Sequence, residues 1–326
     1  IAYEIVESIG PIEGISHAEA APNGYVNIFL DRTVFTQFIL TPDNTHSAKQ
    51  NSKAIVEHTA INPNKAAHIG HLRNAALGDT LARVLRFLGT RVEVQNYIDD
   101  TGVQVADVIV GFQQLDKSTN AEVKQLSEQP RFDYYCWDLY ARVTDWYEKD
   151  ESRLQYRTMT LHALESGSDQ TAQLGNLIAH SIVNCHLATM ARLNVDYDLL
   201  SWESDILQLH FWSRAFEILK TANAVYLETT GPQKGCWVMP ISESGSHDSA
   251  VEESSADNNN GGPKSRTKVI VRSNGTVTYV GKDIAYQFWK FGILDEDFYY
   301  KRHATQSSGR DCWSTTSTQN HDTGPL

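Results

Sequence analysis

The clearest periodic segment of the chain lies between residues 70 and 88, where apolar positions recur at helical spacing. These positions are Leu72, Ala75, Ala76, Ala82, Leu85 and Leu88. Gly89 suits the position after the last turn, because glycine adopts the left-handed conformation without a steric penalty. The segments "KAIVEHT" (53–59) and "RVEVQNYI" (91–98) on either side predict strands.

A strand, a helix and a strand joined by short connections predict a right-handed βαβ unit with parallel strands. Ligands of such sheets bind beyond the carboxyl ends of the strands. Two polar segments, "NPNKAAHIGH" (62–71) and "IDDTG" (98–102), directly follow the two strands. We therefore expect a binding site where these segments meet.

The rest of the chain predicts a mixture of helices and strands. "GYVNIFLD" (24–31) predicts a strand, residues 105–222 are mainly helical, and "AVYLET" and "GCWVMPI" predict strands. Residues 268–280 predict a hairpin whose Asn274-Gly275 pair fits a type I′ turn, followed by a helix with Asp283 near its N-cap. The final residues, from Thr305, show no regular pattern.

Two segments are predicted to lie outside regular structure because they are polar. Residues 41–52 ("TPDNTHSAKQNS") predict a linker. Residues 242–266 are acidic and low in complexity, which predicts a mobile surface loop.

Composition is that of a globular protein, with 41% hydrophobic and 21% charged residues among 326. This length allows two or more domains. The formal net charge of −12 argues against nonspecific binding of DNA through a basic surface, although a local basic groove is compatible with it.

No apolar run is long enough to span a membrane, and the N-terminus does not resemble a signal peptide, so we expect a cytoplasmic protein without membrane partners. The first residue is not methionine, which predicts that the sequence begins within a longer protein. The four cysteines, at 136, 185, 236 and 312, are far apart and give no zinc-binding pattern, so no metal site is expected.

The segment "NPNKAAHIGHLRN" (62–74) offers the most specific chemistry in the chain. His68 and His71 lie three residues apart at the predicted start of a helix, where free N–H groups favour a phosphate. Both histidines can donate to charge that grows on a phosphate under attack. Gly70 allows a flat purine to approach the backbone, and Lys65 can hold another phosphate.

Two other interpretations of this segment remain open. Taken alone, the His-x-Gly-His pattern also fits a helix cap with two half-exposed histidines. Metal binding lacks a third ligand close by in the sequence.

Longer segments give a specific resemblance. "VEHTAINPNKAAHIGHLRNAALGDTLARVLRFLG", "VEVQNYIDDTGVQVADV", "YDLLSWESDIL", "GCWVMP" and "VRSNGTVTYVGKDIAYQFWKFG" together resemble, in order, bacterial arginyl-tRNA synthetases. "HIGH" (68–71) matches the signature of class I aminoacyl-tRNA synthetases. The resemblance runs from residue 20 to residue 315, approximately.

The resemblance implies the fold class: an α/β protein with a class I Rossmann-like parallel sheet, split by a mainly helical insertion. It also implies an enzyme that uses ATP, with Mg²⁺, to activate arginine as arginyl-adenylate and then transfers the arginyl group to tRNA(Arg). The full-length enzyme is expected to be a monomer.

By motif match, His68 and His71 would stabilise the α-phosphate, Gly70 would underlie adenine, and Lys65 would lie near the ATP phosphates. The arginine-binding residues of the family match Glu57, Asn62, Tyr279 and Asp283.

The chemistry of Asp283 and Tyr279 fits that assignment. A carboxylate can meet the planar guanidinium with two parallel hydrogen bonds, and a tyrosine adds a directional contact. The alternatives for these residues are an N-cap, a cross-strand aromatic and, for Glu57, a solvated strand residue. Asp100, Gly102 and Gln104 are further candidates for lining the site, although a plain turn explains residues 99–102 equally well.

The resemblance also suggests domain boundaries. Residues 1–40 match the end of an additional, tRNA-contacting domain, 53–115 the first half of the catalytic domain, 116–266 the insertion, and 267–326 a hairpin, a helix and an irregular tail. Most of the second half, a KMSKS-like loop and an anticodon-binding domain are expected to be missing, and "PKSR" (263–266) is not a substitute for that loop. The chain is therefore expected to be a fragment.

Two competing functions remain at this stage. One is another adenylate-forming enzyme with a His-x-Gly-His site, such as a pantothenate-synthetase-like enzyme. The other is a noncatalytic product of a truncated gene.

Overall fold

The computed structural model describes residues 1–40, 53–167, 169–241 and 267–320. The segments at 41–52 and 242–266, for which a linker and a mobile loop are expected, lie outside the described residues. The chain divides into two compact units, one formed by Ile1–Ser52 with Phe87–Thr90 and the other by Lys53–Arg86 with Arg91–Leu326. None of the helices within the described ranges is both long and apolar enough to cross a membrane.

The first unit contains α1 (Ala2–Ile9), β1 (Ile15–Ala20), β2 (Val26–Leu30) and α2 (Arg32–Leu40). The strands pair antiparallel, and β2 confirms the strand expected at 24–31. The Asp31 carboxylate accepts hydrogen bonds from the backbone N–H groups of Thr33 and Val34, which satisfies free donors at the start of α2.

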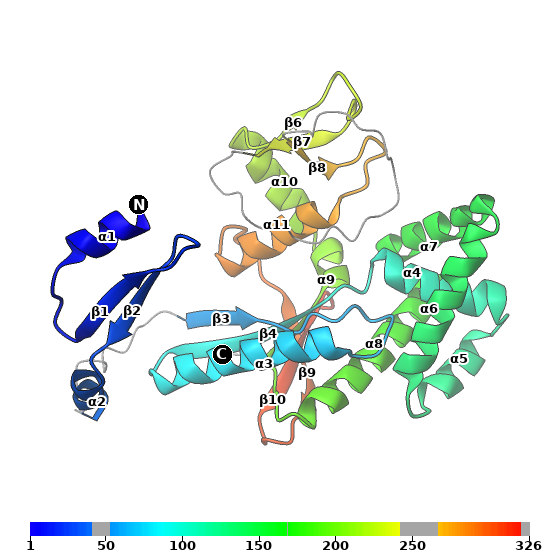
Figure 1. The fold of residues 1–326 in the computed structure, drawn as a ribbon. Helices are drawn as coiled ribbons and strands as arrows, with labels where there is room; N and C mark the ends of the chain where they lie inside the picture. The colour runs from blue at the N-terminus through cyan, green and yellow to red at the C-terminus, as the bar shows by residue number, and fades with distance from the viewer. Residues whose placement is uncertain (41–52, 168, 242–266, 321–326) are drawn as a thin grey trace. The chain divides into compact units, whose positions relative to one another are not determined.

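The second unit is organised around a five-stranded sheet with the order β3-β4-β5-β10-β9 (Figure 1). Its strands are β3 (Lys53–Glu57), β4 (Arg91–Ile98), β5 (Leu199–Trp202), β9 (Tyr299–Thr305) and β10 (Asp311–Thr316). All neighbours are parallel except β9, which pairs antiparallel with β10. The expected βαβ unit is confirmed, because α3 (Ile69–Phe87) joins the parallel pair β3 and β4, and Gly89 has a positive φ of 83°.

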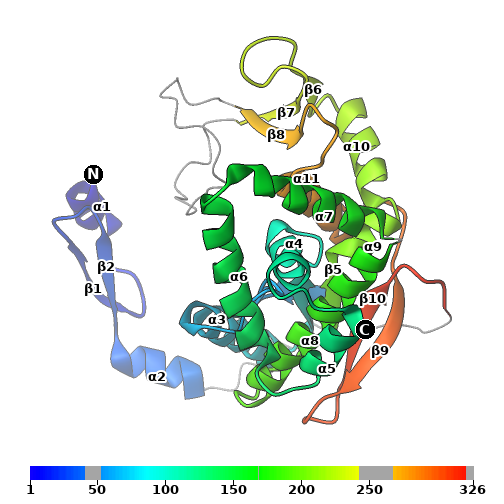
Figure 2. The same cartoon turned by 90° about the vertical axis from the view of Figure 1, so that its right-hand side faces the viewer.

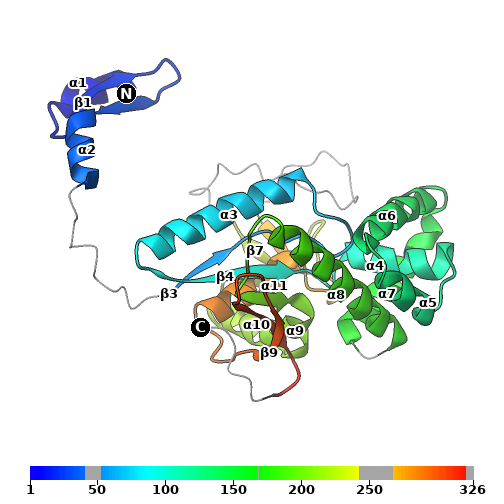
Figure 3. The same cartoon turned by 90° about the horizontal axis from the view of Figure 1, so that it is seen from below.

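Helices cover both faces of this sheet. Ala75 and Ala82 of α3 pack with Val92 and Val94 of β4 on one face, together with residues of α8 (Gln170–Ala191). The alternate residues Glu93, Gln95 and Tyr97 point to the other face, because side chains of a strand alternate. That face is covered by α11 (Tyr279–Lys290), so α3 and α11 lie on opposite sides (Figure 3).

The expected helical middle of the chain is confirmed. A module packs around α4 (Figure 2), with elements α4 (Val103–Val110), η2 (Gly111–Leu115), α5 (Asn120–Ser127), α6 (Phe132–Glu148), η3 (Glu151–Arg153), α7 (Leu154–Ser166) and α8. Its buried carboxylate, Asp107, receives two hydrogen bonds of 2.8 Å from Arg157 and one of 3.0 Å from the Tyr147 hydroxyl. This pairing offsets the cost of burying the charge.

A smaller module follows, formed by α9 (Glu203–Gln208), α10 (Phe211–Thr221), α11 and a three-stranded sheet. The strands β6 (Tyr226–Leu227), β7 (Trp237–Pro240) and β8 (Thr267–Val271) include the two expected at 224–229 and 235–241.

The turn expected at Asn274-Gly275 is not of type I′. Gly275 has a φ of 86°, but Asn274 is not among the residues with positive φ, and the Gly275 N–H donates to the Arg272 carbonyl. This pattern is a type I turn closed by a left-handed glycine. The second arm makes only one bridge, Val271 to Val277, before α11 begins. Thr278, not Asp283, is the N-cap residue, so the N-cap prediction for Asp283 is wrong.

Three strands of the central sheet, β5, β9 and β10, do not follow from the sequence pattern. The tail is not irregular, because β9 and β10 extend the sheet and β10 pairs parallel with β5. Cys312, Ser314 and Thr315 are buried there although two of them are polar. Their hydroxyl groups find partners inside: Ser314 accepts from Trp202 Nε1 and Thr315 donates to Asp205. Polar strands of this kind lack the alternation by which a strand is recognised.

Candidate active site

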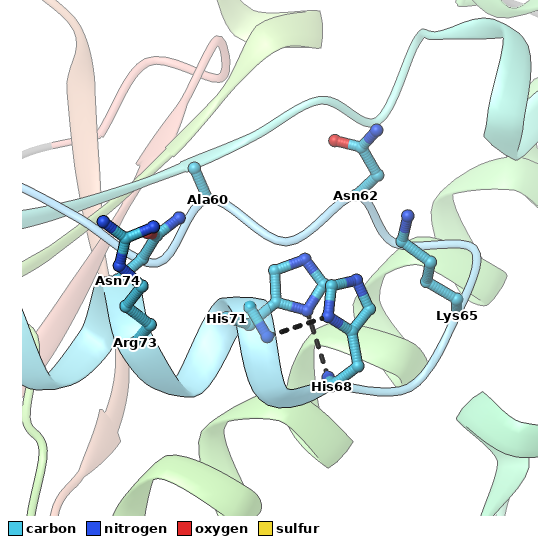
Figure 4. Close-up of a pocket in the computed structure, with 8 residues that line it drawn as sticks. Ala60, Asn62, Lys65, His68, His71, Arg73 and Asn74 are labelled. Atoms are coloured by element: carbon cyan, nitrogen blue, oxygen red, sulfur yellow. Dashed lines mark hydrogen bonds between the residues drawn. The ribbon is translucent and has the colours of Figure 1, made fainter. Parts of the chain in front are cut away.

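The loop after β3 forms a cleft of about 370 Å³ together with the first turn of α3 (Figure 4). Its lining residues are Ala60, Asn62, Lys65, His68, Gly70, His71, Arg73 and Asn74. Five of the sequence-predicted site residues therefore lie together here: Asn62, Lys65, His68, Gly70 and His71.

Backbone hydrogen bonds fix the orientation of both histidine rings. The Gly70 N–H donates to His68 Nδ1 at 3.1 Å, and the His68 N–H donates to His71 Nδ1 at 3.1 Å (Figure 4). A ring nitrogen that accepts a hydrogen bond carries no proton, so each neutral ring is protonated at Nε2. The rings lie side by side, with centroids 3.8 Å apart. The histidines therefore do cap the helix, and they also keep one N–H donor each for a ligand.

The charges around this cleft favour an anionic ligand. None of its lining residues is acidic, whereas Lys65 and Arg73 are cations. Burial, followed by the positive charges of His68, Lys65 and His186, lowers the pKa of His71 to about 4. The His71 ring is therefore a neutral hydrogen-bond donor at physiological pH. A neutral imidazole donor together with the cations of Lys65 and Arg73 can bind the negative oxygens of a polyphosphate.

The cleft loop is held by residues that carry no signal in the sequence. His186 Nε2, on α8, donates to the Lys65 carbonyl at 2.7 Å, and the Ala60 N–H donates to Asn96 Oδ1 at 2.9 Å. Thr59 and Ala60 have positive φ values of 76° and 45°, which non-glycine residues rarely adopt. The tertiary contacts therefore impose the loop's shape against a local backbone preference.

A second cluster, rich in carboxyl groups, lies beyond the ends of β4 and β5. It contains Asp99, Asp100, Glu203 and Asp283 with the ammonium group of Lys282, and the Glu57–Lys290 ion pair lies near Asp283. Burial and then the charge of Glu203 raise the pKa of Asp99 to about 8. Burial also raises the pKa of Asp100 to about 7. Desolvation, followed by the charges of Glu203 and Glu57, raises the pKa of Asp283 to about 6. Negative charge exceeds positive charge in this cluster, which favours a cationic ligand.

The remaining sequence-predicted residues do not line the cleft of the histidines. Glu57 forms an ion pair with Lys290 of α11. Asp100 is buried and accepts a hydrogen bond from the Ser204 N–H. Gly102 lies so close to the Asp99 carboxylate that a Cβ atom would be 2.6 Å from Oδ1. Tyr279 is 69% exposed and Gln104 is half-buried.

Glu203 belongs to this cluster, although the sequence pattern indicates no chemical role for it. Its side chain is buried and forms a 2.7 Å ion pair with Lys282, and the Tyr97 hydroxyl donates to it at 2.8 Å. The only available signal was its place in the segment "WESD". The residue follows β5, a strand that the sequence pattern did not predict.

The raised pKa values of this cluster predict how stability depends on pH. A carboxyl group whose pKa is higher in the folded state binds more protons when folded, so the free energy of unfolding falls as pH rises through that pKa. The five histidines with resolved pKa shifts, all of them downward because of burial, titrate below pH 6.5 and do not affect this range. We expect a decrease of about 1 to 2 kcal/mol between pH 6.5 and 8, measured by urea denaturation.

Asp99→Asn should flatten this dependence because it removes one of the two groups that titrate in the window. Asp138→Asn, at an exposed position on α6, serves as the control and should leave the slope unchanged. A free energy of unfolding that rises with pH over this range would contradict the raised pKa values.

The fold and the cleft together define a class of protein. A parallel sheet whose first strand leads through a His-x-Gly-His turn into a long helix is characteristic of class I aminoacyl-tRNA synthetases. A family model described as "tRNA synthetases class I (R), catalytic domain" matches residues 35–299. The chain belongs to this arginyl-tRNA synthetase family, which confirms the resemblance found in the sequence.

Individual relatives agree with this assignment. The chain is 36% identical over 314 residues to the arginine–tRNA ligase of Pyrococcus furiosus, with 93% of this chain and 47% of the relative covered. It is 34% identical over 316 residues to the arginine–tRNA ligase of Deinococcus radiodurans, covering 97% and 46%. The solved structure of Thermus thermophilus arginyl-tRNA synthetase matches with a TM-score of 0.63 and 32% identity, covering 97% of this chain and 48% of that one. The chain thus spans about half the length of these relatives.

Proposed function

We propose that this chain provides the ATP- and arginine-binding core of an arginine–tRNA ligase, which couples arginine to tRNA(Arg) through arginyl-adenylate. The observation that carries the proposal is the separation of charge at the carboxyl ends of one parallel sheet. The cleft after β3 has cations and histidine donors but no acid, whereas the cluster beyond β4 and β5 has an excess of carboxyl groups. ATP and arginine carry the complementary charges.

In the first step, a carboxylate oxygen of arginine attacks the α-phosphorus of ATP, and pyrophosphate leaves. The Nε2–H groups of His68 and His71 donate to the α-phosphate oxygens as their negative charge grows. Lys65 holds the departing phosphates and Gly70 lies beneath adenine. Mg²⁺ enters with ATP. In the second step, a terminal hydroxyl of the tRNA attacks the arginyl carbonyl carbon and AMP leaves.

Arginine is recognised at both ends of the molecule. Asp283 pairs with the guanidinium and Tyr279 contacts it, since a carboxylate and a planar fork of donors match in geometry. Asn62 contacts the α-amino end. Glu57 lies near enough to Asp283 to raise its pKa, and its own charge is balanced by the ion pair with Lys290. Asp100, Gly102 and Gln104 shape the adjoining wall of the site.

The enzyme works in the cytoplasm as a monomer, with arginine, ATP and tRNA(Arg) as its partners and without a membrane or DNA. The catalytic residues need no bound metal beyond the Mg²⁺ that accompanies ATP.

Calorimetric titration of this chain with ATP, arginine and lysine tests the proposal. We expect ATP to bind, and arginine to bind at least about tenfold more tightly than lysine, because only arginine offers the planar, bidentate fork. Binding of ATP without any preference for arginine would favour another adenylate-forming enzyme. A folded chain that binds neither ligand would favour a noncatalytic product.

A further inference from the structure

Three polar side chains of α11 lie on the face of this helix that meets the central sheet. Lys282, Tyr286 and Lys290 follow one another at four-residue intervals, so they lie on one side of the helix. Lys282 pairs with Glu203 after β5, and Lys290 pairs with Glu57 at the end of β3. The Tyr286 hydroxyl bonds to Gln95 Oε1 of β4 at 2.7 Å and to Ser201 Oγ of β5 at 2.8 Å.

The Lys282–Glu203 ion pair is more deeply buried than the Lys290–Glu57 pair. Lys282 is 7% exposed and Glu203 is 4% exposed. Lys282 Nζ lies 2.7 Å from Glu203 Oε1 and 3.3 Å from Thr101 Oγ1. Thr101 also bonds to Glu203, and the Tyr97 hydroxyl occupies the other carboxylate oxygen. A buried ammonium group tolerates little displacement, because any loss of its partner leaves an uncompensated charge.

The other contacts of the first turn of α11 are made with the smaller module and not with the central sheet. Thr278 Oγ1 donates to the carbonyls of Val269 and Ile270 in β8, and Gly281 packs closely against Trp212 of α10. Both contacts tie the turn to the smaller module. Tyr279 is exposed, and no hydrogen bond of Asp283 is found within the described residues. Lys282 is therefore the side chain of this turn that links it to the end of the central sheet.

We propose that Lys282 and Glu203 act as a positioning pair, which fixes the first turn of α11, and with it Tyr279 and Asp283, against the carboxyl ends of β4 and β5. Neither residue touches the substrate. The pair acts on arginine recognition through Asp283, the next residue along the helix, and this consequence rests on the proposed function. Glu203 also engages the ammonium group of Lys282, which leaves the Asp283 carboxylate available for the guanidinium.

Arginine and ATP affinities of four variants of this chain test the pair. Lys282→Met and Glu203→Gln should each weaken arginine binding by about tenfold or more, because a displacement of about 1 Å in a positioned group can cost about a hundredfold. ATP binding should change less than twofold, since the cleft of the histidines lies on other elements. Lys282→Arg keeps the charge and the pairing, so it should retain most of the arginine affinity. Lys220→Met removes a Lys–Glu pair of equal length on α10, in which Lys220 is half-buried and Glu217 is exposed, and should change neither affinity.

Hydrogen exchange of the same variants provides a readout that does not require arginine. Lys282→Met should accelerate exchange of the amides at 282–284 while the amides of β4 stay protected; uniform acceleration would mean general destabilisation and would overturn a local positioning role. The double variant Lys282→Met with Glu203→Gln removes both buried charges, so it should regain stability without regaining arginine affinity.

The outcomes separate the two proposals. Unchanged arginine affinity in Lys282→Met, in a wild-type background that binds arginine, would overturn the positioning pair and leave the proposed function standing. A wild-type chain that binds ATP but not arginine would overturn the proposed substrate. In that case the hydrogen-exchange rates of the amides at 282–284 in Lys282→Met test the positioning role of the pair. Faster exchange confined to these amides supports the role, and unchanged rates overturn it.

Discussion

Replacing His71 by alanine is expected to slow ATP–pyrophosphate exchange by the full-length protein, measured with arginine and tRNA(Arg) present, at least about a hundredfold, the scale for removing one preorganised donor to a developing oxyanion. His71 accepts a backbone hydrogen bond at Nδ1, so its Nε2–H remains for the phosphate. Its pKa of about 4 keeps the ring neutral, so the donor stays in the same protonation state from pH 6 to 8. The rate should therefore show no titration of His71 within this range.

His68→Ala should cause a loss of similar size, because its ring has the same orientation. His71→Gln should retain more activity than His71→Ala, since the glutamine amide can present an N–H near the position of Nε2. His162→Ala is the matched control: this histidine is exposed on α7 and does not line the cleft. Wild-type rates in both alanine variants would refute the phosphate role of these histidines.

Asp283→Asn is expected to weaken arginine binding about ten- to a hundredfold, because hydrogen bonds to a charged group contribute about 1.5 to 3 kcal/mol. The asparagine amide has nearly the same shape but cannot balance the guanidinium charge. Calorimetry with arginine measures this loss, with ATP as the ligand that should be unaffected. Asp145→Asn, at an exposed site on α6, should bind arginine as the wild type does.

The pKa of Asp283 adds a prediction about pH for the wild type. In the proposed function arginine pairs with the ionised carboxylate, and burial raises the pKa of this group to about 6. Arginine affinity should therefore fall as pH drops below 6, and Asp283→Asn should lack this fall. Burial is the main cause of the raised pKa; the charges of Glu203 and Glu57 raise it further, and those of Lys290 and Lys282 lower it. Affinity independent of pH in the wild type would contradict the role of Asp283.

The sequence predicted an element accurately where the residues of one continuous segment contained its full hydrophobic pattern. The helix at 70–88 differs from α3 by one residue at each end, and the strand at 91–98 matches β4. The segment 62–71 forms one cleft because its residues are close in sequence and lie between two elements of clear type. The four-residue signature is weak by itself, and the longer segments that resemble the family made its functional interpretation specific.

The sequence was less informative where polar residues are buried. Glu93 and Gln95 of β4 are buried because Lys53 and Tyr286 satisfy them, and β10 buries serine and threonine. Such residues have no apolar alternation, and their partners are far away in the chain. The N-cap position of α11 also depends on distant contacts: the carboxylate of Asp283 fits a cap by residue type, but the helix begins earlier, at Tyr279.

The sequence by itself therefore determined the βαβ unit, the cleft of His68 and His71, and the family to which the chain belongs. These features depend on short-range periodicity and on residue types at fixed spacing. The tertiary structure alone decided that β9 and β10 join the sheet and that Glu203 meets Lys282, 79 residues apart in sequence. The physical reason is that a buried charge is stable only beside its partner, and only the folded chain brings the two partners together.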